Sequence, residues 1–194
     1  MPVVSRSLVA MAVCGLTLMG AVPLLAQPAD HPRQDAWILG AALGGGNVDI
    51  DIEDQPKPED KSGFGLGFHF GRGFNPEWVG SVEVNNLWVT VENETQLFSL
   101  WSGAASWYPQ ALWGFYLRGG VGLARGEFRI PDPLPGAETF SESGVGFMAA
   151  LGYEWWTGEQ YTLGPQVDFV WMTLDPTVTV SFLTVSLAFT YYIP

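Results

Sequence analysis

The chain has 194 residues, 47% of them hydrophobic, and its formal net charge is −12 at pH 7. Such an acidic chain repels nucleic acid and anionic membrane surfaces, so we expect neither as a partner. Its single cysteine, Cys14, excludes intramolecular disulfides and thiolate metal sites.

The first 26 residues have the pattern of an export signal. Arg6 supplies a positive charge, residues 8–19 form an uncharged apolar stretch, and Ala26 is the small residue before a cleavage point at Gln27. Val13, just before Cys14, is not the small residue that a lipoprotein signal places there. We predict a cleaved signal peptide over residues 1–26 and one exported domain over residues 27–194; an uncleaved anchor helix is the alternative.

The exported part alternates large apolar with small or polar residues, which is typical of strands. In residues 63–71, phenylalanine and leucine fall on one face, while four glycines and His69 fall on the other. A glycine face suits the narrow interior of a barrel and leaves the bulky face for lipid. The sequence therefore predicts an all-β fold, an eight-stranded antiparallel up-and-down transmembrane β-barrel. The strands are expected over residues 36–45, 63–72, 79–91, 96–108, 115–127, 144–155, 161–173 and 177–193.

The connections between these strands differ in length at the two ends of the expected barrel. Residues 73–78, 109–114 and 156–160 contain the proline, glycine or asparagine that tight turns require, and we expect them on the periplasmic side. Residues 46–62 and 128–143 are longer and acidic, and we expect them as outer loops. No uninterrupted apolar run of helix-spanning length follows residue 26, so membrane-spanning helices are not predicted.

Tryptophans cluster near the predicted periplasmic ends of the strands, as an aromatic girdle requires. These are Trp37, Trp78, Trp107, Trp113, Trp155 and Trp156. Three others, Trp88, Trp101 and Trp171, fall nearer the outer half. A soluble β-protein with tryptophans in its core is the alternative explanation.

The segments at residues 115–128, 143–156 and 185–193 resemble the last strands of small outer-membrane β-barrel proteins of the OmpA, OmpX and OmpW type. The resemblance implies that the final strand is recognised by the barrel-assembly machinery, although Ile193 stands where the family has a terminal aromatic residue. Val178, Val180 and Phe182 have the opposite parity to Val185 and Leu187. We therefore predict a bulge near Phe182 and Leu183.

With bulky residues facing lipid, the charged residues of the strands must point into the barrel, because a charge facing lipid at the midplane costs about 2–4 kcal/mol. We predict an interior polar network of Glu83, Arg118, Glu154, Asp168 and His69, with Arg118 close to Glu154. Since eight strands leave room only for side chains, we interpret this network as a filled interior, with a polar path or gate as the alternative. His69 lacks the neighbouring serine that lipid A enzymes pair with a histidine, so no catalytic residue is predicted.

Two groups of residues are candidate contacts at the outer rim. Arg125 and Arg129 could grip lipopolysaccharide phosphates, although ordinary rim charges are the simpler interpretation. Asp49, Asp51 and Glu53 could offer oxygens to a hard cation, but their segment lacks the glycine and distal glutamate of an EF-hand loop. We favour a solvated acidic loop, and we predict no metal and no cofactor.

The sequence thus favours a monomeric, non-enzymatic protein of the bacterial outer membrane, with partners among outer-membrane lipid, lipopolysaccharide and the barrel-assembly machinery. Its role would be structural or a surface interaction through the acidic outer loops. Three alternatives stay open: OmpW-like binding or passage of small apolar compounds, a lipid A modifying enzyme, and a secreted lipocalin-like carrier whose apolar residues face inward.

Overall fold

The computed structural model describes residues 33–52, 61–91, 94–110, 113–129, 139–175 and 178–194. The predicted signal peptide, residues 53–60 and residues 130–138 lie outside this part of the chain. No helix in the described ranges is long and apolar enough to cross a membrane. The strands are β1 (Trp37–Ile52), β2 (Lys61–Gly73), β3 (Trp78–Val91), β4 (Glu94–Trp107), β5 (Phe115–Arg129), β6 (Thr139–Tyr153), β7 (Trp155–Trp156), β8 (Tyr161–Asp175) and β9 (Val178–Ile193).

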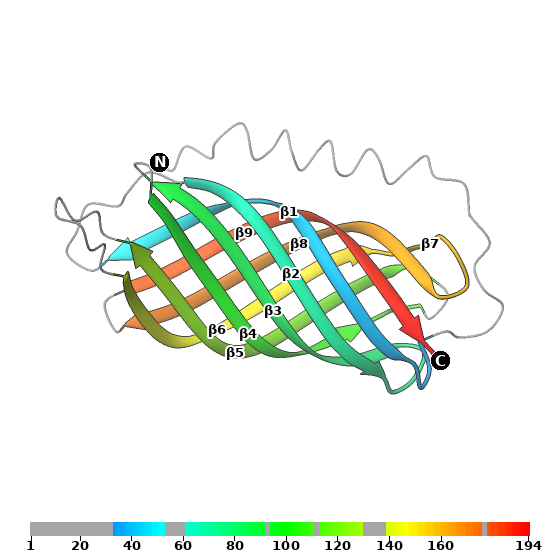
Figure 1. Ribbon diagram of the computed structural model, residues 1–194. Coiled ribbons are helices and arrows are strands. Elements are labelled where there is room, and N and C mark those ends of the chain that lie inside the picture. Colours follow the sequence, from blue (N-terminus) through cyan, green and yellow to red (C-terminus); the bar gives the residue numbers. More distant parts are fainter. Residues whose placement is uncertain (1–32, 53–60, 92–93, 111–112, 130–138, 176–177) are drawn as a thin grey trace, which may run out of the picture.

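The strands form one closed antiparallel barrel (Figure 1). Strands adjacent in sequence pair with each other, and β1 closes the cylinder against β9. Both β6 and β7 pair with β8, so they are two pieces of one wall strand interrupted at Glu154. The predicted eight-stranded barrel is confirmed. Its strands are longer than expected, because β1 continues to Ile52 and β2 begins at Lys61 within the predicted outer loop 46–62.

The pairing register fixes the tilt and width of the barrel. A path across hydrogen-bonded partners runs through Trp37, Arg72, Gly80, Ala105, Gly119, Ala149, Phe169, Leu183 and Asn47. The path returns to β1 ten residues beyond its start (47 − 37 = 10). With eight strands, that stagger corresponds to a tilt of about 40° and a backbone radius of about 8 Å. Such a cylinder has room for side chains but not for an open channel.

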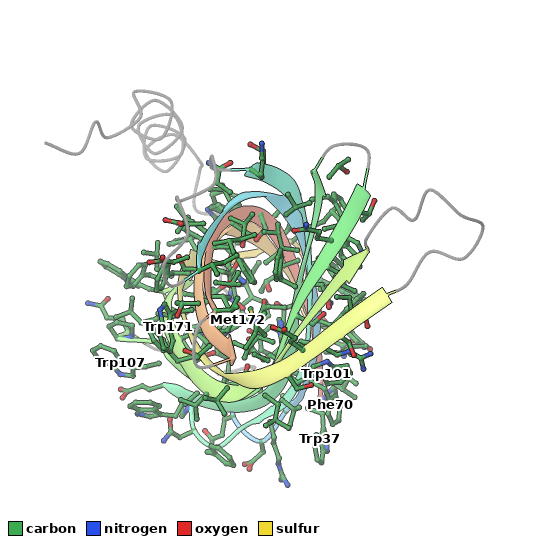
Figure 2. The ribbon with its side chains drawn as sticks, turned by 90° about the vertical axis from the view of Figure 1, so that its left-hand side faces the viewer. Trp37, Phe70, Trp101, Trp107, Trp171 and Met172 are labelled. Atoms are coloured by element: carbon green, nitrogen blue, oxygen red, sulfur yellow. The ribbon has the colours of Figure 1, made fainter. Side chains whose placement is uncertain are left out.

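A belt of large apolar side chains covers the outer face. Val121 is 71% exposed and Leu123 is 69% exposed, although both lie in the middle of regular strands. Figure 2 shows Trp37, Phe70, Trp101 and Trp107 pointing away from the barrel, whereas Met172 points inside and its neighbour Trp171 outside. Along β9, the apolar outer face runs from Leu183 to Ile193, about 25 Å along the axis at this tilt. That height matches the hydrocarbon band of transmembrane barrels.

Aromatic pairs and charges mark the two edges of this belt. We name the edge where β1 begins and β9 ends the terminal end, and the opposite one the loop end. Trp37 stacks on Phe70 and Trp78 on Trp107 at the terminal end, whereas Phe147 stacks on Trp171 toward the loop end. In the described ranges, charged side chains on the outer face lie at the edges of the belt, namely Arg72 at the terminal end and Asp49, Asp51, Arg125 and Glu127 at the loop end.

The two faces of the wall exchange polarity toward the loop end. In β1, Leu39 and Leu43 point outward, but farther along the strand Asp49 and Asp51 point outward and Val48 is buried inside. In β9, Val180 and Phe182 are buried inside, whereas Val185 points outward. The pairing with β1 and β8 is continuous through Phe182 and Leu183, so the predicted bulge there is wrong. The apolar residues thus move from the outer to the inner face without any change in strand register, as expected for a wall whose loop end stands in water and whose remainder stands in lipid.

Candidate functional site: the filled barrel interior

A buried ion pair closes the terminal end of the barrel. Arg33, just before β1, is 1% exposed, and its Nη2 donates to Glu154 Oε2 at 3.0 Å. The same carboxylate accepts hydrogen bonds from the hydroxyls of Tyr192 (2.7 Å) and Tyr108 (3.2 Å). The Arg33 guanidinium carbon also lies 3.8 Å from the centre of the Tyr108 ring. Residues from before β1, after β4, between β6 and β7, and from β9 therefore meet at one carboxylate.

The interruption between β6 and β7 is what positions Glu154. Its backbone N–H donates to the carbonyl of Gly114 at 2.9 Å, outside the regular ladder. A Cβ added at Gly114 would lie 1.9 Å from the Glu154 carbonyl oxygen, so only glycine permits this approach. The next residue but one, Trp156, is buried against Tyr192 with ring centroids 4.9 Å apart. Trp156 therefore packs inside the barrel mouth, and its predicted place in the girdle is wrong.

Arg33 is held in its charged form. Burial by itself would lower the pKa of this guanidinium, but the oxygens of Tyr192, Glu154 and Tyr108 outweigh burial and leave the pKa above its ordinary value. Sequence reasoning missed this residue, because Arg33 lies before the first alternating stretch and no periodicity points to it. The signal available was weak: Arg33 is the only cationic residue in the 30 positions after the predicted cleavage point.

A second polar network fills the middle of the barrel. Arg118 Nη1 lies 3.2 Å from Glu83 Oε1, and Arg118 Nε donates to Ser106 at 2.8 Å. Asp168 accepts hydrogen bonds from Gln166 Nε2 (2.6 Å) and from the Thr184 hydroxyl (3.3 Å). The predicted pairing of Arg118 with Glu154 is wrong, because the partner of Arg118 is Glu83 and that of Glu154 is Arg33.

His69 is buried in the same layer. Its ring occupies the space that Gly40 leaves, since a Cβ there would lie 2.1 Å from His69 Cε1. The register places His69 beside Glu83, and Glu83 beside Ser102, so a histidine, an acid and a serine share one cross-strand row. The His69 Nε2 and Ser102 Oγ atoms have no hydrogen-bond partner. This row faces the filled interior, where no lipid headgroup can reach it, so the arrangement does not favour catalysis.

Apolar side chains fill the loop-end part of the interior. They come from every wall strand except β2 and include Leu87, Phe98, Leu100, Val170, Met172, Val180 and Phe182, each at most 2% exposed. The interior therefore consists of an aromatic and ionic layer, a polar layer and an apolar layer.

The candidate contacts at the rim lie on the outer face of the loop end. Arg125 is exposed and its Nη2 lies 3.0 Å from Glu127 Oε1. The Arg129 side chain and Glu53 lie outside the described part of the structure. Asp49 and Asp51, expected in a loop, belong to β1, where they pair with Ser181 and Thr179 of β9. The described residues contain no group of three or more His, Cys, Asp or Glu side chains able to hold a metal ion.

Known proteins resemble the chain in structure but not in sequence. No family model and no curated protein matches it. The structure of Ail, the attachment invasion locus protein of Yersinia pestis, superposes with a TM-score of 0.61 at 12% identity, covering 81% of this chain and 99% of Ail. The chain has the fold of the small outer-membrane β-barrels.

Two further structures support this assignment of the outer-membrane barrel fold. Ail in complex with the heparin analogue sucrose octasulfate has a TM-score of 0.56 at 14% identity, covering 81% of this chain and 100% of Ail. Neisserial surface protein A has a TM-score of 0.56 at 11% identity, covering 80% of this chain and 96% of that protein. The predicted resemblance to small outer-membrane barrels is confirmed at the level of the fold.

Proposed function

We propose that the protein is a non-enzymatic, monomeric barrel of the bacterial outer membrane that acts through its acidic outer surface. The observation that carries this proposal is the outer belt, about 25 Å tall and uncharged between its edges. The terminal end would lie in the periplasm and the loop end at the cell surface. Asp49 and Asp51 already lie on the outer wall of the loop end, and the sequence adds six acidic residues in positions 53–60 and 130–138.

The first prediction concerns location and conductance. We expect the protein in the outer-membrane fraction, with a gel mobility that changes on boiling, because a barrel closed by hydrogen bonds resists detergent at room temperature. In planar bilayers it should give no stable conductance, since the ionic pair, the polar network and the apolar layer fill its interior. A pore-forming barrel serves as the positive control. Reproducible openings at the nanosiemens level, or recovery of the protein in the soluble fraction, would contradict the proposal.

Lipopolysaccharide is the partner that we propose for the loop-end edge of the belt. Asn86, Ser99, Arg125 and Ser143 are successive cross-strand partners on β3 to β6 and form one polar row on the outer face. The row immediately below consists of Val84, Trp101, Leu123 and Val145. A phosphate above its acyl chains would meet Arg125, with Arg129 as a second candidate, where the wall changes from apolar to polar.

The second prediction tests this lipid contact. Arg125→Gln should weaken the binding of purified lipopolysaccharide to the folded protein by about three- to tenfold, because a charge-assisted hydrogen bond is lost. Arg72→Gln, at the opposite edge of the belt, is the matched control and should leave binding unchanged. Binding can be measured by the rise in melting temperature as lipopolysaccharide is titrated. Equal effects of both substitutions would point to nonspecific charge attraction.

The final strand supports insertion by the barrel-assembly machinery, since Val185, Leu187 and Phe189 present a continuous apolar outer face.

The other candidate functions find less support. The cavity beside Asp168, at about 10 Å³, is far too small for small apolar compounds, which need a site of about 300 Å³ or more. A soluble carrier would not expose the belt. Ail binds a sulfated heparin analogue, but the net charge of −12 disfavours a soluble polyanion that, unlike lipopolysaccharide, has no acyl chains to lie against the belt.

A further inference from the structure

A small cavity lies inside the barrel where the wall is lined by glycine. Ala42, Gly65, Gly67, Asn85, Asp168 and Thr184 line it, and its volume is about 10 Å³. That volume is about the minimum that one water molecule needs. Because Asn85, Asp168 and Thr184 are polar and all line the cavity, it differs from a packing defect between apolar side chains alone.

Asp168 is the one buried carboxylate of the described interior without an arginine within 4 Å. Glu83 has Arg118 at 3.2 Å, and Glu154 has Arg33 at 3.0 Å. Asp168 is 3% exposed, and its hydrogen-bond donors Gln166 and Thr184 are both neutral. A buried carboxylate without a close countercharge is costly unless further donors solvate it.

Asn85, which lines the same cavity, carries an unused hydrogen-bond donor. Its Nδ2 atom is buried and has no hydrogen-bond partner. A buried amide N–H without an acceptor is also costly, and the group that satisfies it must be an acceptor. A water molecule can accept from Asn85 and donate to Asp168 at the same time, whereas a bare cation can do neither.

We propose that the cavity is an internal water site. The bound water accepts a hydrogen bond from Asn85 Nδ2 and donates one to the Asp168 carboxylate, and the Thr184 hydroxyl offers a third contact. The ligand class is therefore a single water molecule, and its role is to solvate the one carboxylate of the central network that lacks a nearby guanidinium.

Gly65→Ala tests the proposal, because it fills the cavity without touching Asn85 or Asp168. The added Cβ would lie 3.2 Å from Thr184 Cγ2 and 3.9 Å from the Asn86 carbonyl oxygen. If the methyl group displaces a bound water, the folding equilibrium constant should fall about tenfold, since two buried polar groups lose a partner. Gly103→Ala is the matched control, because a Cβ there meets nothing within 4 Å.

The same substitution in an Asn85→Ala background separates the loss of water from steric strain. The Thr184 contact is identical in both backgrounds, but without the amide there is no unused donor and there is more room. We expect Gly65→Ala to lose most of its effect on the folding equilibrium constant in that background. Both effects are measured by urea unfolding in detergent micelles.

An equal fall of the folding equilibrium constant in both backgrounds would assign the effect to strain, and a rise in both would show an empty void. Stabilisation by sodium but not by choline, abolished in Asp168→Asn, would assign the cavity to a cation. Each of these three results would overturn the proposal.

Discussion

Arg33→Met is expected to lower the free energy of unfolding by about 3–5 kcal/mol, because it leaves the Glu154 carboxylate buried without its countercharge. The hydroxyls of Tyr108 and Tyr192 would still donate to Glu154, but neither carries a positive charge. Urea titration in detergent micelles, followed by tryptophan fluorescence, measures the loss. Trp156 reports on this layer directly, because its ring lies 5.5 Å from the Arg33 guanidinium.

Two variants control this experiment. Arg72→Met removes an exposed arginine that lies 3.8 Å from Asp35, and it should change stability by less than about 1 kcal/mol. The double variant Arg33→Met with Glu154→Gln removes both charges and keeps an acceptor for the tyrosines, so it should recover at least half of the loss. If the double variant is no more stable than Arg33→Met, packing rather than charge explains the role of Arg33.

Val82→Arg is expected to destabilise the folded protein in lipid vesicles by about 2–4 kcal/mol, because it places a charge on the outer face near the middle of the belt. Val82 is 63% exposed in the structure. In a water-soluble protein the same change would be nearly neutral, since a lone exposed valine contributes little to a surface. The free energy of unfolding measured by urea titration of vesicle-folded protein therefore shows whether lipid or water surrounds this face.

Thr90→Arg is the matched control on the same strand and the same face. Thr90 lies eight residues beyond Val82 in β3, where the outer face of the wall has become polar. Its substitution should cost at most about 1 kcal/mol, as expected near an interface. Equal costs at both positions would mean that the belt does not mark the depth of the membrane.

The sequence was sufficient to predict the wall of the barrel. Alternation with a period of two identifies strands, and it also separates lipid-facing residues such as Leu187 from inward ones such as Asp168. The prediction from alternation failed where apolar residues were assumed to face lipid along the whole length of a strand. Phe182 was expected outward because apolar residues were assigned to lipid everywhere, whereas the surroundings of the wall change from lipid to water along β9.

Partners within the interior were harder to predict than orientation. Parity shows that Arg118 and Glu154 both face inward, but Arg118 pairs with Ala150 in the ladder, four residues before Glu154. Four strand residues correspond to about 13 Å, beyond the range of a direct ion pair. The contact of Arg118 with Glu83 bridges β5 and β3 across the inner face of β4, and which inward side chains meet two strands apart depends on the strand register, which alternation does not encode.

The ionic cluster at Glu154 also has a consequence for the order of assembly. Arg33 and Glu154 are separated by 121 positions, and Tyr192 belongs to the strand that closes the cylinder against β1. These groups cannot meet before the first and last strands have joined. If this closure of the barrel comes after the rate-limiting step of folding, the cluster also forms after that step. In that case, weakening the cluster accelerates unfolding and leaves the folding rate nearly unchanged. The cluster then contributes kinetic stability: it prolongs the lifetime of a finished barrel without hastening its formation.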